Sequence, residues 1–223
     1  LEGVLARAAA DGGRVALRYS DVGRRFYERS GFRPVDASDA FGRVPRGQRG
    51  PDGWRLVAMT REHRHAVAAA REATAARARF TITRDEALWE YLRTRSRGFF
   101  DRYVGADIRQ RCQVALHGGA VAGYVVTVEG RGEWSLRELG ALDGDPGTEV
   151  AILTATGCAA AERGHRRVHG WLAPEFARRL PDWRWSRSPR RRAVPMLVGL
   201  GGHPAIADLC RPGATDLTFL DQF

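Results

Sequence analysis

Tyr27 is the side chain whose sequence surroundings suggest chemistry most directly. The pattern around it predicts a strand that ends near Ser20, followed at once by a helix that carries Tyr27. A helix start presents free backbone N–H groups and the positive end of the helix dipole, which favours an anion or a phosphate nearby. Gly23 would let such a ligand approach closely, and the Tyr27 phenol could project into the same cleft. The alternative is that Tyr27 packs with Phe26 and Phe32 as a core aromatic residue.

Composition predicts a folded protein with one large domain or two small ones. The chain has 223 residues, of which 43% are hydrophobic and 28% are charged, as in ordinary globular proteins. The net charge of +10 comes from arginine alone, because the sequence contains no lysine. GC-rich coding explains such a bias. The alternative explanation is a basic surface for nucleic acid or for the phosphates of a nucleotide cofactor.

The spacing of the cysteines and the length of the apolar runs indicate in which compartment of the cell to expect the protein. The three cysteines lie far apart, without the spacing of metal ligands, and their odd number argues against a disulfide framework. We therefore expect free thiols and no bound metal. The longest apolar runs, residues 120–128 and 193–202, are shorter than the roughly 20 residues of a membrane helix. The expected location is cytoplasmic, with no membrane partner.

The expected elements place Tyr27 in a strand, helix and strand unit. Residues 14–19 alternate as a half-covered strand, and Ser20 and Asp21 are suited to cap the helix that follows. Gly31 closes that helix where a left-handed residue is wanted, and an extended segment resumes after it.

The rest of the chain is expected to add a loop, a linker and a second set of strands and helices. Residues 36–52, rich in Gly, Pro and Arg, predict a surface loop. Residues 61–79 contain hardly any bulky apolar residue and predict a solvent-facing linker helix. The other expected elements are strands at 54–59, 113–116, 120–128, 134–142 and 168–172, helices at 84–103 and 148–163, and a pairing of 183–185 with 193–199. The three strands between 113 and 142 suggest an antiparallel meander.

Residues 15–32 resemble motif B of the GNAT superfamily of acetyl-CoA-dependent N-acetyltransferases. In that family the motif is a strand, then Asn-x-x-Ala-x-x-x-Tyr on a helix, then Gly-Phe opening the next strand. Tyr27, Gly31 and Phe32 match this pattern. The resemblance implies a mixed-sheet α/β fold, with the C-terminal portion of a first GNAT domain at the start of this chain.

The resemblance also implies roles for individual residues. Tyr27 would act as the general acid that protonates the departing coenzyme A thiolate. Ser20, Gly23 and Phe26 would contact the cofactor, although Gly23 stands where the family has alanine and Ser20 replaces an asparagine that often contacts pantetheine. The family's pyrophosphate loop is expected just before Leu1, so we expect the chain to be truncated at its N-terminus and to show weak or no activity alone.

The second half also resembles a GNAT core in its order of helix, three strands, helix and strand. Residues 134–142 stand where the strand before the pyrophosphate loop belongs, and residues 143–148 stand in place of that loop. Two acidic residues and a proline there repel phosphate and remove a donor, so we expect a degenerate copy that does not bind the cofactor. Tandem GNAT proteins of this kind include the Eis-like aminoglycoside acetyltransferases and a fungal lysine acetyltransferase-like group. By that resemblance, the terminal carboxylate of Phe223 is a candidate base.

These expectations divide the chain into the C-terminal half of a catalytic GNAT domain at 1–59, a linker helix at 60–83 and a second GNAT-like domain at 84–223. The leading prediction is an acetyltransferase that uses acetyl-CoA as co-substrate and acts on a small-molecule or peptide amine. One alternative is a non-catalytic GNAT-like binding or interaction module. Another is a basic nucleic-acid binder, which no accompanying motif supports.

Overall fold

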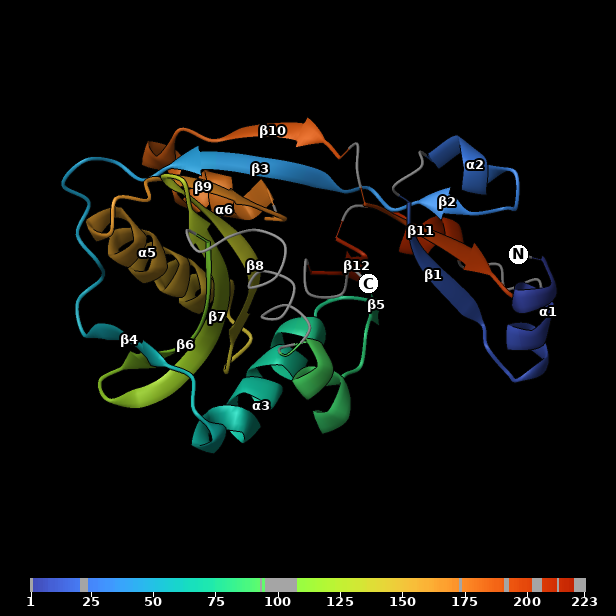
Figure 1. The fold of residues 1–223 in the computed structure, drawn as a ribbon, viewed down its shortest axis with the longest axis horizontal. Coiled ribbons are helices and arrows are strands. Elements are labelled where there is room, and N and C mark those ends of the chain that lie inside the picture. Colours follow the sequence, from blue (N-terminus) through green and yellow to red (C-terminus); the bar gives the residue numbers. More distant parts are fainter. Residues whose placement is uncertain are drawn as a thin grey trace.

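The chain has a mixed α/β fold with two main sheets. The computed structural model describes residues 2–20, 24–92, 94, 108–172, 174–190, 193–201, 206–211 and 213–218. Within these residues, seven strands form a large sheet in the order β10-β3-β9-β8-β7-β6-β4, and three form a small sheet in the order β1-β11-β2 (Figure 1). A short parallel pair, β5 (Phe80–Thr81) with β12 (Thr215–Asp216), lies between them.

The large sheet contains the meander expected from the sequence. Its strands are β3 (Ser38–Arg43), β4 (Trp54–Ala58), β6 (Arg109–His117), β7 (Ala120–Gly130), β8 (Glu133–Ala141), β9 (Arg167–Gly170) and β10 (Ser186–Pro189). Strands β6, β7 and β8 are antiparallel neighbours, and the chain turns from β6 into β7 at Gly118 and Gly119, which both have positive φ. Strands β8 and β9 are parallel, with α5 (Pro146–Glu162) as the crossover between them.

Helix α5 covers one face of the large sheet. Trp134 and Leu136 of β8 pack with Ile152 and Leu153 of α5, and all four side chains are buried. Trp183 of the 3-10 helix η2 (Pro181–Trp183) closes this cluster, and α6 (Pro174–Arg179) precedes it. Burying these large side chains is the main source of stability for this face.

Helix α3 (Arg64–Ala75) covers the opposite face, with the 3-10 helix η1 (Arg61–His63) before it and a helix at residues 86–92 after it (Figure 1). Val67 and Ala70 of α3 are buried against Tyr124 of β7. The expectation that this helix faces solvent is therefore wrong. The alanines let the helix lie close to the sheet, and the Ala70 carbonyl oxygen lies 3.2 Å from where a Cβ on Gly140 would stand. The buried face was not predicted because alanine, as a small residue, gives little contrast in hydrophobicity between the buried and the exposed face.

The small sheet carries the unit around Tyr27. Its strands are β1 (Val15–Ser20), β2 (Arg33–Pro34) and β11 (Val194–Gly199). Helices α1 (Glu2–Ala10) and α2 (Arg24–Glu28) pack on one face and α7 (Ile206–Leu209) packs on the other. Gly31 has φ 82° just after α2, as the sequence predicts.

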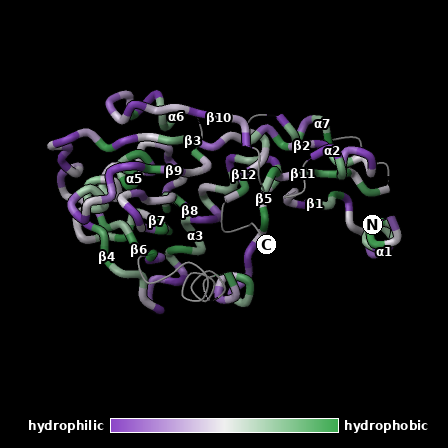
Figure 2. Tube along the Cα trace, turned by 45° about the horizontal axis from the view of Figure 1, so that its top comes forward, coloured by the Kyte–Doolittle hydropathy of each residue, from purple (hydrophilic) through white to green (hydrophobic). Residues whose placement is uncertain are grey.

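The two sheets exchange a strand. Strand β3 lies between β9 and β10 of the large sheet, although it follows β2 in the chain. Strand β11 lies between β1 and β2 of the small sheet, although it follows β10. Figure 2 shows the contrast between hydrophilic β10, at the edge of the large sheet, and hydrophobic β11, in the middle of the small one.

This exchange corrects two expectations. Residues 36–52 are not only a loop, because they contain β3. Residues 183–185 and 193–199 do not pair, because the chain on either side of their connection enters different sheets. The division into 1–59, 60–83 and 84–223 stays a prediction. In the described part of the chain, no helix has the length and apolar character to cross a membrane.

Candidate functional site

Tyr27 is packed into the core of the small sheet. Its side chain is 6% exposed, and its ring lies edge-on to Phe26 and Phe32, with centroids 5.0 and 5.9 Å away. The Arg18 guanidinium stands over the ring at 4.6 Å from the centroid, which is within cation–π range. Met196 of the exchanged strand β11 belongs to the same cluster. The ring orientation is therefore fixed from several sides.

Ser20 is the second predicted site residue that the structure brings to this unit. It ends β1, is fully buried, and its Oγ has no hydrogen-bond partner among the described residues. Because side chains alternate along a strand, Ser20 faces the same side as Arg18, which contacts Tyr27. A buried hydroxyl without a partner costs free energy, so Ser20 is a position where a ligand could supply the missing bond.

The other predicted site residues do not join this arrangement. Phe26 is 63% exposed and touches Tyr27 at its ring edge. Gly23 and Phe223 lie outside the described residues. Sequence reasoning missed Arg18, although the alternation of residues 15–19 could have placed it on the face of Ser20 and α2.

Two aspartates in the loop before α5 accept hydrogen bonds from donors at the start of that helix. Asp145 accepts a hydrogen bond from the backbone N–H of Thr148 at 3.1 Å. Asp143 accepts from the Asp145 N–H at 2.9 Å and from the Thr148 hydroxyl at 2.8 Å. Pro146 has no N–H to offer at the first turn. Two carboxylates occupy the N-terminus of α5, and this arrangement does not fit the diphosphate of a nucleotide cofactor.

A buried charge network fills the space beyond the point where β8 and β9 separate. The two strands pair from Glu133 opposite Arg167 to Leu136 opposite Gly170. Strand β8 then bulges and continues to Ala141 paired with β7 but not with β9. Glu138 lies in the region beyond, with an exposed side-chain fraction of 0%.

Charged and polar side chains from several elements surround the Glu138 carboxylate. Arg84 donates to it at 2.7 Å, the Tyr124 hydroxyl donates at 2.6 Å, and the Arg71 guanidinium lies at 3.3 Å. Arg71 is also ion-paired with Asp216 of β12. Burial and the Glu138 charge raise the pKa of Tyr124 well above its usual value, so the phenol stays protonated. These contacts fix the C-terminal strand β12 across this space.

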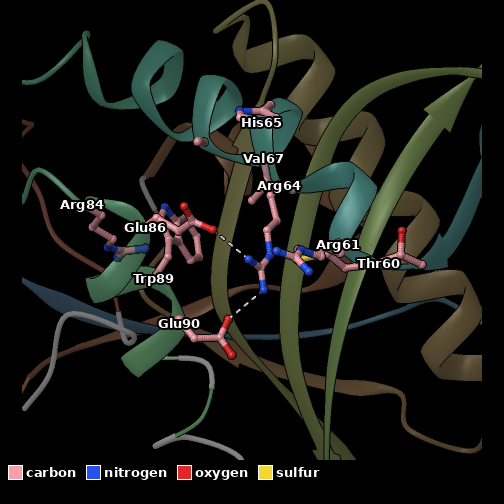
Figure 3. Close-up of a pocket in the computed structure, with 11 residues that line it drawn as sticks. Thr60, Arg61, Arg64, His65, Val67, Arg84, Glu86, Trp89 and Glu90 are labelled. Carbon is pink, nitrogen blue, oxygen red and sulfur yellow. Dashed lines mark hydrogen bonds and ion pairs between the residues drawn. The ribbon is translucent and has the colours of Figure 1, made fainter.

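A pocket of about 450 Å³ lies between α3 and the helix at 86–92 (Figure 3). The figure shows Arg64 reaching from α3 to Glu86 and Glu90, at 2.8 and 3.2 Å. The Arg84 guanidinium lies 4.8 Å from the ring centroid of Trp89. Arg64 is therefore held by two carboxylates and Arg84 by Glu138 and the Trp89 ring, so both arginines of this pocket are engaged within the protein.

Comparison with known proteins identifies the fold. No protein-family model matches the chain, and no curated protein matches it. A GCN5-related N-acetyltransferase from Anabaena variabilis superposes on 88% of this chain and 48% of its own, with TM-score 0.65 and 14% identity. The chain has the fold of GCN5-related N-acetyltransferases.

Other solved structures with this fold agree. A protein of unknown function from Enterococcus faecalis, described as a probable N-acyltransferase, superposes on 88% of this chain and 47% of its own, with TM-score 0.63 and 14% identity. Eis1 from Mycobacterium abscessus covers 87% of this chain and 49% of its own, with TM-score 0.50 and 16% identity. The chain therefore spans about half the length of these structures. Among the described residues, no group of three or more His, Cys, Asp or Glu could hold a metal ion.

Proposed function

We propose that this chain is part of an N-acetyltransferase that transfers acetyl from acetyl-CoA to an amine. The observation that carries the proposal is the unit of β1, α2 and β2, which holds Tyr27 in a fixed orientation and places the unpartnered Ser20 hydroxyl on the same face of the small sheet. The fold supports the reaction class. Tyr27 is proposed as the general acid, with Ser20, Gly23 and Phe26 beside the co-substrate.

The proposed reaction needs one proton donor at the leaving sulfur. The lone pair of the neutral amine attacks the thioester carbonyl carbon, the C–N bond forms, and the C–S bond breaks with its electron pair moving to sulfur. The Tyr27 hydroxyl gives its proton to that sulfur, and the proton lost by the amine nitrogen restores the phenol through water. The cluster around Tyr27 holds the donor in one place, which is what such a transfer requires.

The large sheet is proposed as a second core that does not bind acetyl-CoA. Asp143 and Asp145 accept hydrogen bonds from the donors at the start of α5. Arg71, Glu138 and Asp216 occupy the region where β8 is no longer paired with β9. On this proposal, the large sheet shapes the acceptor site and does not supply the backbone donors for the diphosphate.

Acetyl-CoA titration tests the proposal, using this chain and a chain extended with its upstream coding sequence. We expect binding and turnover in the extended chain. Tyr27→Phe should lower kcat by about 100-fold and leave the affinity for acetyl-CoA unchanged, because the ring packing is kept and only the proton is lost. Tyr91→Phe, at a tyrosine that is 53% exposed, is the matched control. Equal loss of kcat and affinity would identify Tyr27 as a structural residue.

Ser20→Ala separates a cofactor contact from a packing role. Because the hydroxyl has no partner in the described structure, its removal should leave the free energy of unfolding unchanged or raise it. If Ser20 binds the co-substrate, the affinity for acetyl-CoA should fall by about tenfold.

A non-catalytic binding or interaction module is the second candidate function. The observation that favours it is the burial of Tyr27 at 6% exposure among apolar side chains. If the extended chain binds no acetyl-CoA in the titration, this second candidate replaces the first.

A further inference from the structure

A second pocket lies where the two sheets meet. Its volume is about 410 Å³, and its walls come from the connection between β2 and β3, the chain after β9, the strand β10 and the strand β12. The exchange of β3 and β11 brings these segments together at the centre of the molecule (Figure 1). The pocket is distinct from the one between α3 and the helix at 86–92.

Two arginines form one side of this pocket. Arg190 is 3% exposed, its guanidinium carbon lies 3.1 Å from the ring centroid of Trp171, and its Nε donates to Asp39 at 3.3 Å. Arg187 donates to the Leu172 carbonyl at 2.7 Å and to the Ser38 hydroxyl at 2.6 Å. Both guanidinium groups are therefore held in fixed positions at the pocket wall.

Burial disfavours the charged form of both arginines. Burial lowers the pKa of Arg190 to about 10, although Asp39 opposes this shift. Burial also lowers the pKa of Arg187 more than the Asp36 charge raises it. A lowered pKa means that the surroundings disfavour the cation, so an anion bound beside these groups would be stabilised.

Carboxylates stand elsewhere on the pocket wall. Asp216 is 28% exposed, and the ion pair with Arg71 uses its Oδ2. Asp36 is exposed in the connection between β2 and β3. The pocket therefore offers cations and anions within one volume, which suits a ligand that carries both charges.

We propose that this pocket binds the acceptor, and that the acceptor is an amine that also carries a carboxylate, of the size of an amino acid or a dipeptide. The carboxylate binds at Arg187 and Arg190, and the amine lies toward Asp216 and Asp36. This assignment rests on the proposed acetyl transfer. It narrows the amine acceptors to amino acids and short peptides and makes Arg187 a residue that determines specificity.

Calorimetric titration of the 223-residue chain tests the pocket without acetyl-CoA. The probes are alanyl-alanine, leucyl-leucine and alanyl-phenylalanine, each compared with its C-terminal amide, which keeps the amine and loses the carboxylate. We expect at least one peptide acid to bind about tenfold more tightly than its amide. Binding of acids and amides with equal affinity, or of none of them, would overturn the assignment.

Arg187→Gln is the matching variant, because the side chain is exposed and glutamine keeps a donor while losing the charge. It should reduce the preference for acid over amide to less than about threefold. Arg46→Gln, at an exposed arginine in the loop after β3, is the control and should keep the full preference. An equal loss in both variants would show that general surface charge, and not this pocket, selects the acid.

Turnover in the extended chain distinguishes this inference from the proposed function. Acetylation of simple amines as fast as of the peptide acids would overturn the acceptor class and leave acetyl transfer intact. Preferential binding of peptide acids without any acetylation would contradict the proposed function, while the ligand class of the pocket would stand.

Discussion

At the scale of single residues, buried carboxylates in this chain differ in what surrounds them. Glu129 of β7 is 3% exposed and accepts from Arg111 of β6 at 2.5 Å and from Arg163, at the end of α5. Burial disfavours its charge, but the hydrogen bonds and charges of the two guanidiniums outweigh burial and lower its pKa. Glu149 of α5 has the opposite balance: burial raises its pKa more than Arg77 lowers it.

Glu129→Gln should destabilise the protein by about 1 to 3 kcal/mol at pH 7, because two guanidiniums lose their shared anion. The folded-state pKa lies below the unfolded value of about 4.3, so this stabilisation is complete above that value and is lost as pH falls through the folded pKa. Urea unfolding of the wild type and variant between pH 7 and pH 3 measures it. A free-energy difference that does not shrink on acidification would contradict the assignment.

Glu149→Gln should behave in the opposite way. Its folded pKa lies above the unfolded value, so ionisation costs stability as pH rises through that interval. As pH rises from 4 to 7, the free energy of unfolding of the variant should increase relative to that of the wild type. At pH 7 the variant should be less stable by no more than about 1 kcal/mol, or more stable than the wild type. The same unfolding series measures both variants, which serve as controls for each other. A loss at pH 7 as large as that of Glu129→Gln would refute the distinction.

At the scale of elements, the start of α5 shows how a short loop decides what a helix can bind. The Asp145 side chain caps the Thr148 N–H, and Asp143 binds the Thr148 hydroxyl, so the first turn is satisfied within the chain. The helix start therefore has a structural role here. The two carboxylates also place negative charge at the helix start, which disfavours a phosphate there.

Asp145→Ala should lower the free energy of unfolding by about 1 kcal/mol, because the Thr148 N–H loses its acceptor. Asp145→Asn is the matched control, since asparagine caps nearly as well, and it should cost only a few tenths of a kcal/mol. Urea unfolding at pH 7 compares the two. If both variants lost the same stability, the charge of Asp145, and not its capping bond, would be responsible.

Local patterns predicted the elements that depend on nearby residues. The meander and α5 lie within a few residues of their expected ranges, because alternation, capping and helix-ending glycines act over short distances. The alternation of 14–19 also places Arg18 on the face of Ser20, a relation that sequence reasoning missed. Strand β3 was missed because its neighbours, β9 and β10, lie more than 100 residues away in the sequence. The pocket at the junction was missed for the same reason.

At the scale of the whole molecule, the exchanged strands make the two sheets depend on each other. The small sheet has β11 at its centre, and the chain reaches β11 only after leaving the large sheet at β10. The large sheet likewise holds β3 between β9 and β10. Removing β11 from the small sheet, or β3 from the large one, would leave backbone groups of the neighbouring strands without hydrogen-bond partners. We therefore expect one cooperative unfolding transition.

Leu197→Ala tests this coupling. Leu197 of β11 is fully buried in the small sheet, and its truncation should cost about 2 to 5 kcal/mol. The tryptophans lie outside β1, β2 and β11, at positions 54, 89, 134, 171, 183 and 185. Their fluorescence therefore reports mainly on the large sheet. If the sheets unfold together, the free energy of unfolding measured by tryptophan fluorescence should fall by the full cost of the truncation, and the urea midpoint should fall with it.

The control for this prediction is Val4→Ala on α1, where the side chain is 69% exposed and the midpoint should stay within error of the wild type. Circular dichroism, which senses both sheets, should give the same midpoint as fluorescence for Leu197→Ala. A lower midpoint by circular dichroism with unchanged tryptophan fluorescence would show that the small sheet unfolds alone. In that case the exchanged strands would join the sheets in space without coupling their stability, because β11 would leave the small sheet while β3 stayed paired in the large one.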